Sequence, residues 1–221
     1  MGNAVVQRTN MVEGQVRTSD VTDRRILRAM LDVPREIFAP AEMQPLAYFD
    51  QDLRVSGADQ PPRYILAASV FARMAQALDI HSENVVLDVG CATGYSSAIL
   101  ARLAQTVVGV EVETGLAETA TQILSGLSVD NVVVVSGPLD AGWPNEGPYD
   151  AILVNGAIAV PPTKLIEQLS DGGRLAAVLA DGVSGQATLW QRSGSHVSSR
   201  SLFDAAAAPL PGFQRTPQFV F

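Results

Sequence analysis

A strand, turn and helix signature at residues 85–103 constrains the fold of this chain more than any other feature. The apolar run VVLDV is followed by a turn that contains Gly90 and Gly94, and then by a segment of helical character. Glycine has no Cβ and tolerates positive φ, so backbone N–H groups at such a turn can approach a ligand closely. In doubly wound sheets, ligands bind at this junction. The segment therefore predicts a ligand-binding loop in an α/β fold.

Spacing within the loop disfavours two common ligands. The dinucleotide fingerprint G-x-G-x-x-G requires a glycine where Ala92 stands. A phosphate-binding loop ends in Gly-Lys-Ser/Thr, whereas Gly94 is followed by Tyr95 and the loop contains no lysine. A nucleoside triphosphatase is therefore disfavoured. An NAD-binding domain stays as the weaker alternative, and it predicts no affinity for a methyl donor.

The remaining pattern, Asp88-x-Gly90-x-x-x-Gly94, resembles motif I of class I S-adenosylmethionine-dependent methyltransferases. Their cofactor is cationic and carries no phosphate, so a carboxylate suits it. Glu111 follows the next expected strand, and from the neighbouring position in the sheet its carboxylate can accept both ribose hydroxyls. The alternative is that the glycines form only a tight turn and that Glu111 is a solvated strand end. The expected cofactor-binding residues are Asp88, Gly90, Cys91, Ala92, Gly94, Ser97, Glu111, Val112, Gly137, Pro138 and Leu139.

Composition narrows the class of protein. The 221 residues, 47% of them hydrophobic, suffice for one α/β domain with a sizeable core. A formal net charge of −8 disfavours a nucleic-acid partner, because such binding relies on Lys and Arg at the phosphates. No apolar run reaches membrane-spanning length. The single cysteine cannot form an internal disulfide, and no signal segment is recognised at the start, so a cytoplasmic location is expected.

Hydrophobic periodicity predicts a single domain over residues 1–221, with a helical extension and active-site loop at 1–80 and a cofactor-binding core at 81–221. The expected fold is a Rossmann-like, doubly wound sheet of about seven mostly parallel strands with helices on both faces. Ser19 or Thr22 is expected to cap a helix within the extension. Strands are expected at 85–89, 106–110, 131–135, 150–154 and 173–180, and helices at 65–78, 95–104, 114–126 and 161–169.

Two further segments carry specific expectations. The polar stretch FDQDLRVSGADQPPRY at residues 49–64 contains Pro and Gly and is expected to form a loop that closes over the active site. The tail at residues 198–221 is expected to form two more strands around PLPGF.

Several segments resemble the protein-L-isoaspartate O-methyltransferase family in order and spacing. The telling elements are VPREIFAP at 33–40 and AYFD at 47–50. The other matching segments are MVEGQVR at 11–17, ILRAM at 26–30, NV at 131–132, PYDAI at 148–152, QL at 168–169 and GGRL at 172–175. The resemblance covers about residues 11 to 180. It implies methylation of the free carboxyl of isoaspartyl residues in damaged proteins, with S-adenosylmethionine as cofactor and without a metal.

The chain departs from the family pattern at three places. Relatives carry a serine in the active-site loop where Pro61 stands here, so polar groups nearby become the candidate substrate contacts. These candidates are Ser56, Asp59, Gln60, Arg63 and Asn155. The family's Gly-Asp-Gly, whose acid helps to hold the adenine amino group, is Gly137-Pro138-Leu139 here, and the C-terminal segment does not map onto the usual ending.

Several roles stay open on the sequence alone. Asp88 either orders the glycine loop or faces the ammonium of the cofactor, and a nucleophilic role for Cys91 is disfavoured. Arg63 either pairs with a substrate carboxylate or is solvated at a helix start, and Asn155 contacts substrate or forms a turn. No catalytic residue is assigned, because a carboxylate is already a nucleophile at neutral pH. Another carboxylate acceptor, or a cofactor-binding regulatory module without turnover, remains an alternative.

Overall fold

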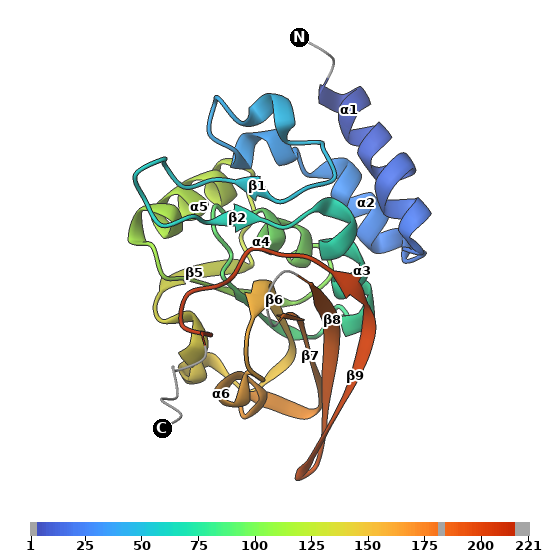
Figure 1. Ribbon diagram of the computed structural model, residues 1–221, viewed down its shortest axis with the longest axis vertical. Coiled ribbons are helices and arrows are strands. Elements are labelled where there is room, and N and C mark those ends of the chain that lie inside the picture. Colours follow the sequence, from blue (N-terminus) through green and yellow to red (C-terminus); the bar gives the residue numbers. More distant parts are fainter. Residues whose placement is uncertain (1–3, 181–183, 215–221) are drawn as a thin grey trace, which may run out of the picture.

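A seven-stranded sheet forms the centre of the computed structural model, which describes residues 4–180 and 184–214 (Figure 1). Its strand order is β5-β4-β3-β6-β7-β8-β9. The strands are β3 (Val85–Val89), β4 (Thr106–Glu111), β5 (Val132–Ser136), β6 (Tyr149–Ile158), β7 (Leu169–Ala180), β8 (Gly185–Ser193) and β9 (His196–Ala205). Neighbouring strands from β5 to β7 are parallel, and β8 is antiparallel to both β7 and β9. The predicted Rossmann-like, mostly parallel sheet is confirmed.

Each face of the sheet is covered by its own core. Successive strand residues point to opposite faces, so Val86 packs in one core, which we name the first core, and Leu87 packs in the other, the second core. Four helices follow residue 67: α3 (Ala68–Leu78), α4 (Tyr95–Leu100), α5 (Thr114–Gly126) and α6 (Thr163–Ile166). Buried residues of α3, α4 and α5 join the core of Val86, whereas Leu165 of α6 joins that of Leu87. Helices therefore cover both faces, as expected.

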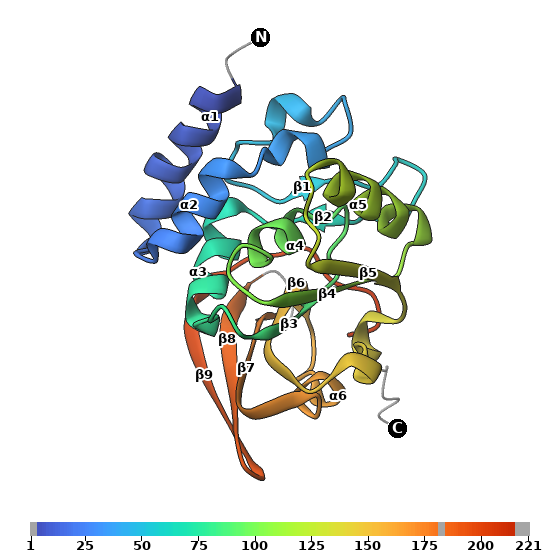
Figure 2. The ribbon, with the colours of Figure 1, turned by 180° about the vertical axis from the view of Figure 1, so that it is seen from behind.

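The N-terminal region is helical and packs on the first core, beside α3 (Figure 2). Its helical pieces are α1 (Ala4–Met11), a π-helical turn (Val12–Val16), a 3-10 turn (Arg17–Ser19), α2 (Arg24–Asp32) and two further 3-10 turns (Arg35–Phe38 and Gln44–Leu46). Met11, Val16, Ile26 and Met30 recur at helical spacing and are all fully buried. Their burial explains why a segment of mixed polarity folds onto the sheet.

The residue that caps α2 differs from the expected one. Asp23, rather than Ser19 or Thr22, accepts a hydrogen bond from the Arg25 N–H at 2.8 Å. The Ser19 hydroxyl instead donates to the Gln15 carbonyl, four residues earlier. Asp23 directly precedes α2, so its carboxylate reaches a free N–H group of the first turn, whereas the Ser19 hydroxyl is engaged with the preceding turn.

Element boundaries also differ where proline or pairing intervenes. The expected helix at 161–169 is reduced to α6, because Pro161 and Pro162 precede it and β7 begins at Leu169. The expected helix at 95–104 ends at Leu100, and the one at 65–78 begins at Ala68. Residues 49–64 form a loop as predicted, with a short pair of strands, β1 (Leu53–Arg54) and β2 (Tyr64–Ile65), at its ends.

The expected strands at 198–221 are confirmed only in part, because residues 198–205 belong to β9 and the PLPGF segment itself is not a strand. The two C-terminal strands are β8 and β9, which form a hairpin through a two-residue turn at Gly194, where φ is +57°. A Gly-Ser pair between alternating residues is a hairpin signal that the Ser-rich composition obscured. Residues 206–213 instead run across the carboxyl end of β6, where Pro209 and Pro211 lack the N–H groups that a strand needs. Residues 215–221 of the expected segment lie outside the described residues.

We name residues 206–214 the strap. Figure 1 shows it in red, crossing from the end of β9 over the upper end of β6 and beneath β1 and β2. It is fixed to β6 by two hydrogen bonds, from the Ala157 N–H to the Ala208 carbonyl at 2.8 Å and from the Leu210 N–H to the Ala157 carbonyl at 2.9 Å. Within residues 4–180 and 184–214, no helix combines the length and apolar character that crossing a membrane requires.

Asp23→Ala is expected to lower the free energy of unfolding by about 1 kcal/mol, because the first turn of α2 loses its cap. Thr22→Ala, one residue away and exposed, is expected to leave it unchanged. Urea unfolding followed by circular dichroism would compare the two variants with the wild type. Equal losses in both variants would contradict the assignment of the cap to Asp23.

Candidate functional site

Three buried polar side chains meet at the carboxyl ends of neighbouring parallel strands. Asp88 lies in β3, Glu111 ends β4 and Asn155 lies in β6, with exposures of 0%, 0% and 6%. β3 stands between β4 and β6, so the strand order runs outward from β3 to β4 and β5 on one side and to β6 and β7 on the other. Such a switch point opens a crevice beyond the carboxyl ends of the strands, which is where α/β sheets bind ligands. We name this set of residues and the glycine turn above it the crevice.

The glycine turn contains three positive φ angles, two at glycines, which adopt them freely, and one at an alanine, which adopts it at a cost. Gly90 and Gly94 have φ of +73° and +94°, and Ala92 between them has +52°. A Cβ at position 94 would lie 3.2 Å from the Cβ of Ala120, so glycine also permits close packing of α4 on α5. The N–H groups of Gly90 and Cys91 both donate to the Val110 carbonyl. The turn therefore wraps around the end of β4 and reaches its terminal acid.

Asp88 organises the junction between β3 and α4. Its Oδ2 accepts hydrogen bonds from the hydroxyls of Ser96 and Ser97, and its Oδ1 accepts one from the Asn155 amide, all at 2.6 Å. Burial raises the pKa of Asp88, and these three hydrogen bonds only partly offset it. This arrangement supports the interpretation that Asp88 orders the glycine loop. Because Asn155 lies within β6, the alternative that it forms a turn is wrong.

Glu111 is held by five hydrogen bonds and is not a solvated strand end. Its Oε1 accepts from Arg63 Nε at 3.0 Å, from the Val112 N–H at 2.9 Å and from the Glu113 N–H at 3.2 Å. Its Oε2 accepts from Arg63 Nη2 and from the Ala92 N–H, both at 2.8 Å. Arg63 is 2% exposed, so the alternative that it is solvated at a helix start is also wrong.

The Cys91 thiol is buried beside the same acids. Burial, with Asp88 and Glu111 nearby, raises its pKa well above the ordinary value. The thiolate is the nucleophilic form of cysteine, so a raised pKa removes reactivity at neutral pH. In the part of the chain that the structure describes, no cluster of three or more His, Cys, Asp or Glu is arranged to hold a metal ion.

Four other residues expected to bind cofactor follow the ends of β4 and β5. The Val112 N–H donates to Glu111, and the Gly137 N–H donates to the Glu111 carbonyl at 3.0 Å. Pro138 precedes a 3-10 turn whose first residue, Leu139, is buried in the second core. These positions bring the end of β5 beside the end of β4, and the cofactor-binding role of each remains a prediction.

The structure brings together only some of the residues expected to bind substrate. Ser56 lies in the hairpin between β1 and β2, and its hydroxyl accepts a hydrogen bond from the Arg63 N–H at 2.9 Å. Asp59, Gln60 and Pro61 are exposed at the tip of that hairpin, where Gln60 accepts from the Gly57 N–H. Their roles remain predictions, with Ser56 and Arg63 at the crevice and the tip residues outside it.

Sequence reasoning did not anticipate the strap as part of the crevice. A Cβ at Gly156 would lie 2.5 Å from Leu210 Cγ, and one at Gly90 would lie 3.2 Å from Leu210 Cδ2. Leu210 therefore lies over Gly90 of the crevice and over Gly156, which follows Asn155. The only sequence signal is the Gly after Asn155, which marks a close approach of another backbone or side chain but does not say which.

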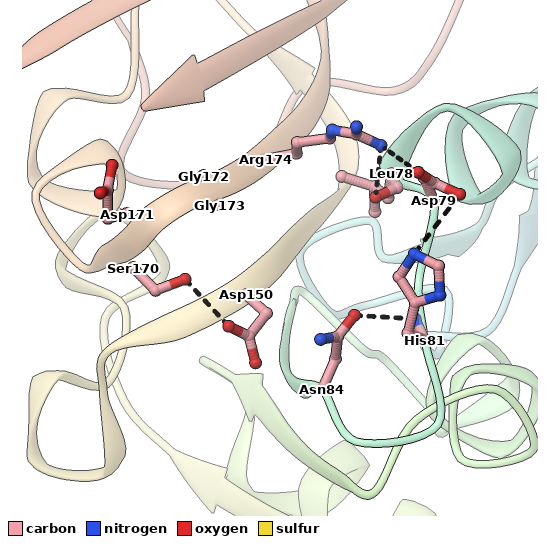
Figure 3. Close-up of a pocket in the computed structure, with 10 residues that line it drawn as sticks. All are labelled: Leu78, Asp79, His81, Asn84, Asp150, Ser170, Asp171, Gly172, Gly173 and Arg174. Atoms are coloured by element: carbon pink, nitrogen blue, oxygen red, sulfur yellow. Dashed lines mark hydrogen bonds and ion pairs between the residues drawn. The ribbon is translucent and has the colours of Figure 1, made fainter. Parts of the chain in front are cut away.

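A polar pocket of about 220 Å³ lies elsewhere, at the amino ends of β6 and β7 (Figure 3). In it Arg174 pairs with Asp79 at 2.9 Å, and Asp79 lies 3.8 Å from His81. Since parallel α/β sheets bind ligands at the carboxyl ends of their strands, this pocket is not the candidate site.

Comparison with known proteins gives one consistent family. The family model described as protein-L-isoaspartate(D-aspartate) O-methyltransferase matches residues 6–209. A protein-L-isoaspartate O-methyltransferase of Herpetosiphon aurantiacus is 35% identical over 207 residues, covering 93% of this chain and 90% of its own. One of Methanoculleus marisnigri is 40% identical over 172 residues, covering 77% and 76%.

Solved structures show the same fold. A protein-L-isoaspartate O-methyltransferase matches with a TM-score of 0.82 and 24% identity, covering 93% of this chain and 66% of that one. A Plasmodium falciparum protein described by the same activity, in complex with S-adenosyl-L-homocysteine, matches with a TM-score of 0.76 and 19% identity, covering 91% and 96%. At these identities the likeness supports the architecture alone.

Asp88→Asn is expected to change how stability depends on pH. Burial raises the pKa of Asp88 in the folded state, so the folded chain binds a proton at this group more tightly than the unfolded chain does. The stability that Asp88 contributes is therefore full below its ordinary pKa and is lost as pH rises through the raised one. Urea unfolding across this pH range should show the wild type losing stability relative to the variant. A difference that is constant, or that runs the other way, would contradict this prediction.

Proposed function

This chain belongs to the protein-L-isoaspartate(D-aspartate) O-methyltransferase family, and on that basis we propose that it transfers a methyl group from S-adenosylmethionine to a carboxylate of a damaged protein. The observation that carries the proposal is the buried carboxylate of Glu111 at the carboxyl end of β4, next to a glycine turn at the switch point of the sheet. An acid at this place suits the two hydroxyls of a ribose.

The donor groups of the crevice fit the cofactor in chemical type. Glu111 offers carboxylate oxygens, and the turn at Gly90 allows close approach. The loop has no lysine, which a phosphate would need and this cofactor does not. In this conformation both oxygens of Glu111 also bind Arg63. The residues that would hold S-adenosylmethionine are therefore present, and Arg63 must leave Glu111 before the ribose can take its place.

The chemistry asks for positioning rather than for proton transfer. When bound, S-adenosylmethionine supplies a methyl group on a sulfonium, which an ionised carboxylate can attack in line. A carboxyl group is ionised at neutral pH, so the chain has no proton to remove. Its residues instead orient the acceptor and exclude water. This agrees with a crevice in which the acids are engaged by hydrogen bonds and the thiol of Cys91 stays protonated.

The proposed acceptor is the free carboxyl of an isoaspartyl residue, as the names of the relatives suggest. The exposed Pro61 supplies neither a hydroxyl nor an N–H group at the hairpin tip. This observation favours a second candidate, a methyltransferase for a different carboxylate acceptor. A regulatory module that binds the cofactor without turnover is the remaining alternative.

We further propose that residues 1–221 act as one methyltransferase domain in the cytoplasm. The first core supports a single unit, since it contains residues from Met11 in α1 to Ala205 in β9. The free, buried Cys91 is compatible with a reducing compartment.

The proposal can be tested by titration calorimetry with S-adenosylhomocysteine, followed by transfer of a labelled methyl group to an isoaspartyl peptide. A peptide with aspartate at the same position is the control. Binding with isoaspartyl-selective transfer supports the repair activity. Binding with transfer only to other carboxylates supports the second candidate, binding with no transfer to any acceptor supports the regulatory module, and no binding overturns the cofactor assignment.

Glu111→Gln is expected to weaken S-adenosylhomocysteine binding by about tenfold or more, because an amide offers one acceptor oxygen where the carboxylate offers two. It is also expected to lower the free energy of unfolding by about 3 kcal/mol, since Arg63 keeps its buried charge without a partner. Glu113→Gln is the matched control and should change neither. Calorimetry and urea unfolding measure the two effects, and unchanged affinity in Glu111→Gln would contradict the ribose assignment.

A further inference from the structure

Arg63 makes the pairing that a carboxylate ligand would otherwise make. Its Nε and Nη2 bind the two oxygens of Glu111 at 3.0 Å and 2.8 Å, a two-point geometry that is specific for guanidinium and carboxylate. Arg63 is 2% exposed and Glu111 is 0% exposed. The pair is therefore removed from water. Separating its two charges without giving each a new partner has a large cost in free energy.

The guanidinium of Arg63 also occupies the surface of the glycine turn. A Cβ at Gly90 would lie 2.9 Å from Arg63 Nη2 and 3.2 Å from Leu210 Cδ2. Gly90 has φ of +73°, so the backbone here is shaped for close approach by another group. In this conformation the approaching groups are a side chain of the hairpin and one of the strap. The chain thus fills the face of the turn that a ligand would contact.

Asp52 links the hairpin and the strap directly. It follows the loop that leads into β1, and its Oδ2 accepts a hydrogen bond from the Ala208 N–H at 3.0 Å. Its Oδ1 accepts from the Ala67 N–H, at the start of α3, at 2.9 Å. The strap that carries Leu210 and the hairpin that carries Arg63 are therefore held to each other. Movement of one disturbs the other.

We propose that Arg63 exchanges between two carboxylates: it binds Glu111 while the crevice is closed, and it binds the carboxylate of the acceptor once the cofactor has taken Glu111. This inference rests on the proposed function and names the residue that recognises the acceptor. In it Arg63 takes over the polar contact that Pro61 cannot make at the hairpin tip.

The exchange follows from the charges that are buried. When a ribose takes the oxygens of Glu111, Arg63 loses its partner and a buried guanidinium without a carboxylate is strongly unfavourable. The acceptor of the proposed reaction brings a carboxylate to the same crevice, and it offers the same two-point geometry. Each ligand therefore gives a new partner to the buried charge that the other ligand leaves unpaired when the Arg63–Glu111 pair separates. They should therefore bind with positive cooperativity, and the coupling must be equal in both directions.

Binding of S-adenosylhomocysteine to Arg63→Gln tests the closing half of the exchange. Calorimetry is expected to show about tenfold tighter binding than in the wild type, because the ligand no longer competes with Arg63 for Glu111. Arg54→Gln is the matched control. Arg54 lies in β1 of the same hairpin and binds the carbonyls of Gly57, Ala58 and Gln60 at its tip, so the variant removes an arginine from the hairpin but keeps the Arg63–Glu111 pair and the strap in place. Its affinity should equal that of the wild type.

Addition of an isoaspartyl peptide tests the second half. In the wild type, saturating peptide is expected to raise the affinity for S-adenosylhomocysteine by about fivefold or more, and a peptide with that carboxyl amidated should have no effect. In Arg63→Gln the isoaspartyl peptide should produce no such increase. Both measurements report binding and need no turnover.

Leu210→Ala keeps the proposal testable if Arg63→Gln fails to fold. It loosens the strap over Gly90 and leaves the ion pair intact, so it too should bind S-adenosylhomocysteine more tightly than the wild type. Measurable binding in the wild type that is no tighter in either folded variant overturns the closing role. Absence of coupling to the isoaspartyl peptide in the wild type overturns the exchange while leaving the cofactor assignment in place. Absence of S-adenosylhomocysteine binding in the wild type and in both variants overturns this inference together with the proposed function.

Discussion

The buried ion pair between Arg63 and Glu111 is the interaction on which the arrangement of the crevice depends. It joins the hairpin to the end of β4 and lies directly on the glycine turn. A buried ion pair seldom adds net stability, because the cost of removing both charges from water rivals their attraction. Its value therefore lies in geometry, since it fixes where the hairpin crosses the sheet and which face of the turn is covered. The strap then closes over the same place through Asp52 and Leu210.

Beneath that pair, the network of Asp88 makes the floor of the crevice rigid. Asp88 joins β3 to α4 through Ser96 and Ser97 and to β6 through Asn155. Two donors come from α4 and one from β6, so a single carboxylate in β3 fixes the relative positions of three elements. A rigid floor beneath a cover made of hairpin and strap confines conformational change to the cover. The exchange proposed for Arg63 needs this division.

Local patterns predict the floor of the crevice, whereas the cover depends on pairings between distant residues. Asp88, Gly90, Gly94 and Glu111 are recognisable because strand, turn and helix follow one another along the chain. Arg63 and Glu111 are 48 positions apart, and Asp52 and Ala208 are 156 apart. No periodicity encodes such contacts. The helix cap at Asp23 and the hairpin at Gly194 were missed for a smaller reason, because neighbouring Ser and Thr residues give competing local signals.

The position of Pro61 explains why recognition of an acceptor would move from the hairpin tip to its base. Proline at the exposed tip fixes φ and supplies no donor, so the tip is stiff and offers little polar contact. Two residues later the chain turns inward, with the Arg63 N–H bound by Ser56 and its side chain directed at Glu111. These contacts, rather than the tip, hold Arg63 over the crevice. Loss of a hydroxyl at the tip is thereby compatible with selection of a carboxylate, because a guanidinium recognises both oxygens of that group while a hydroxyl donates only one hydrogen bond.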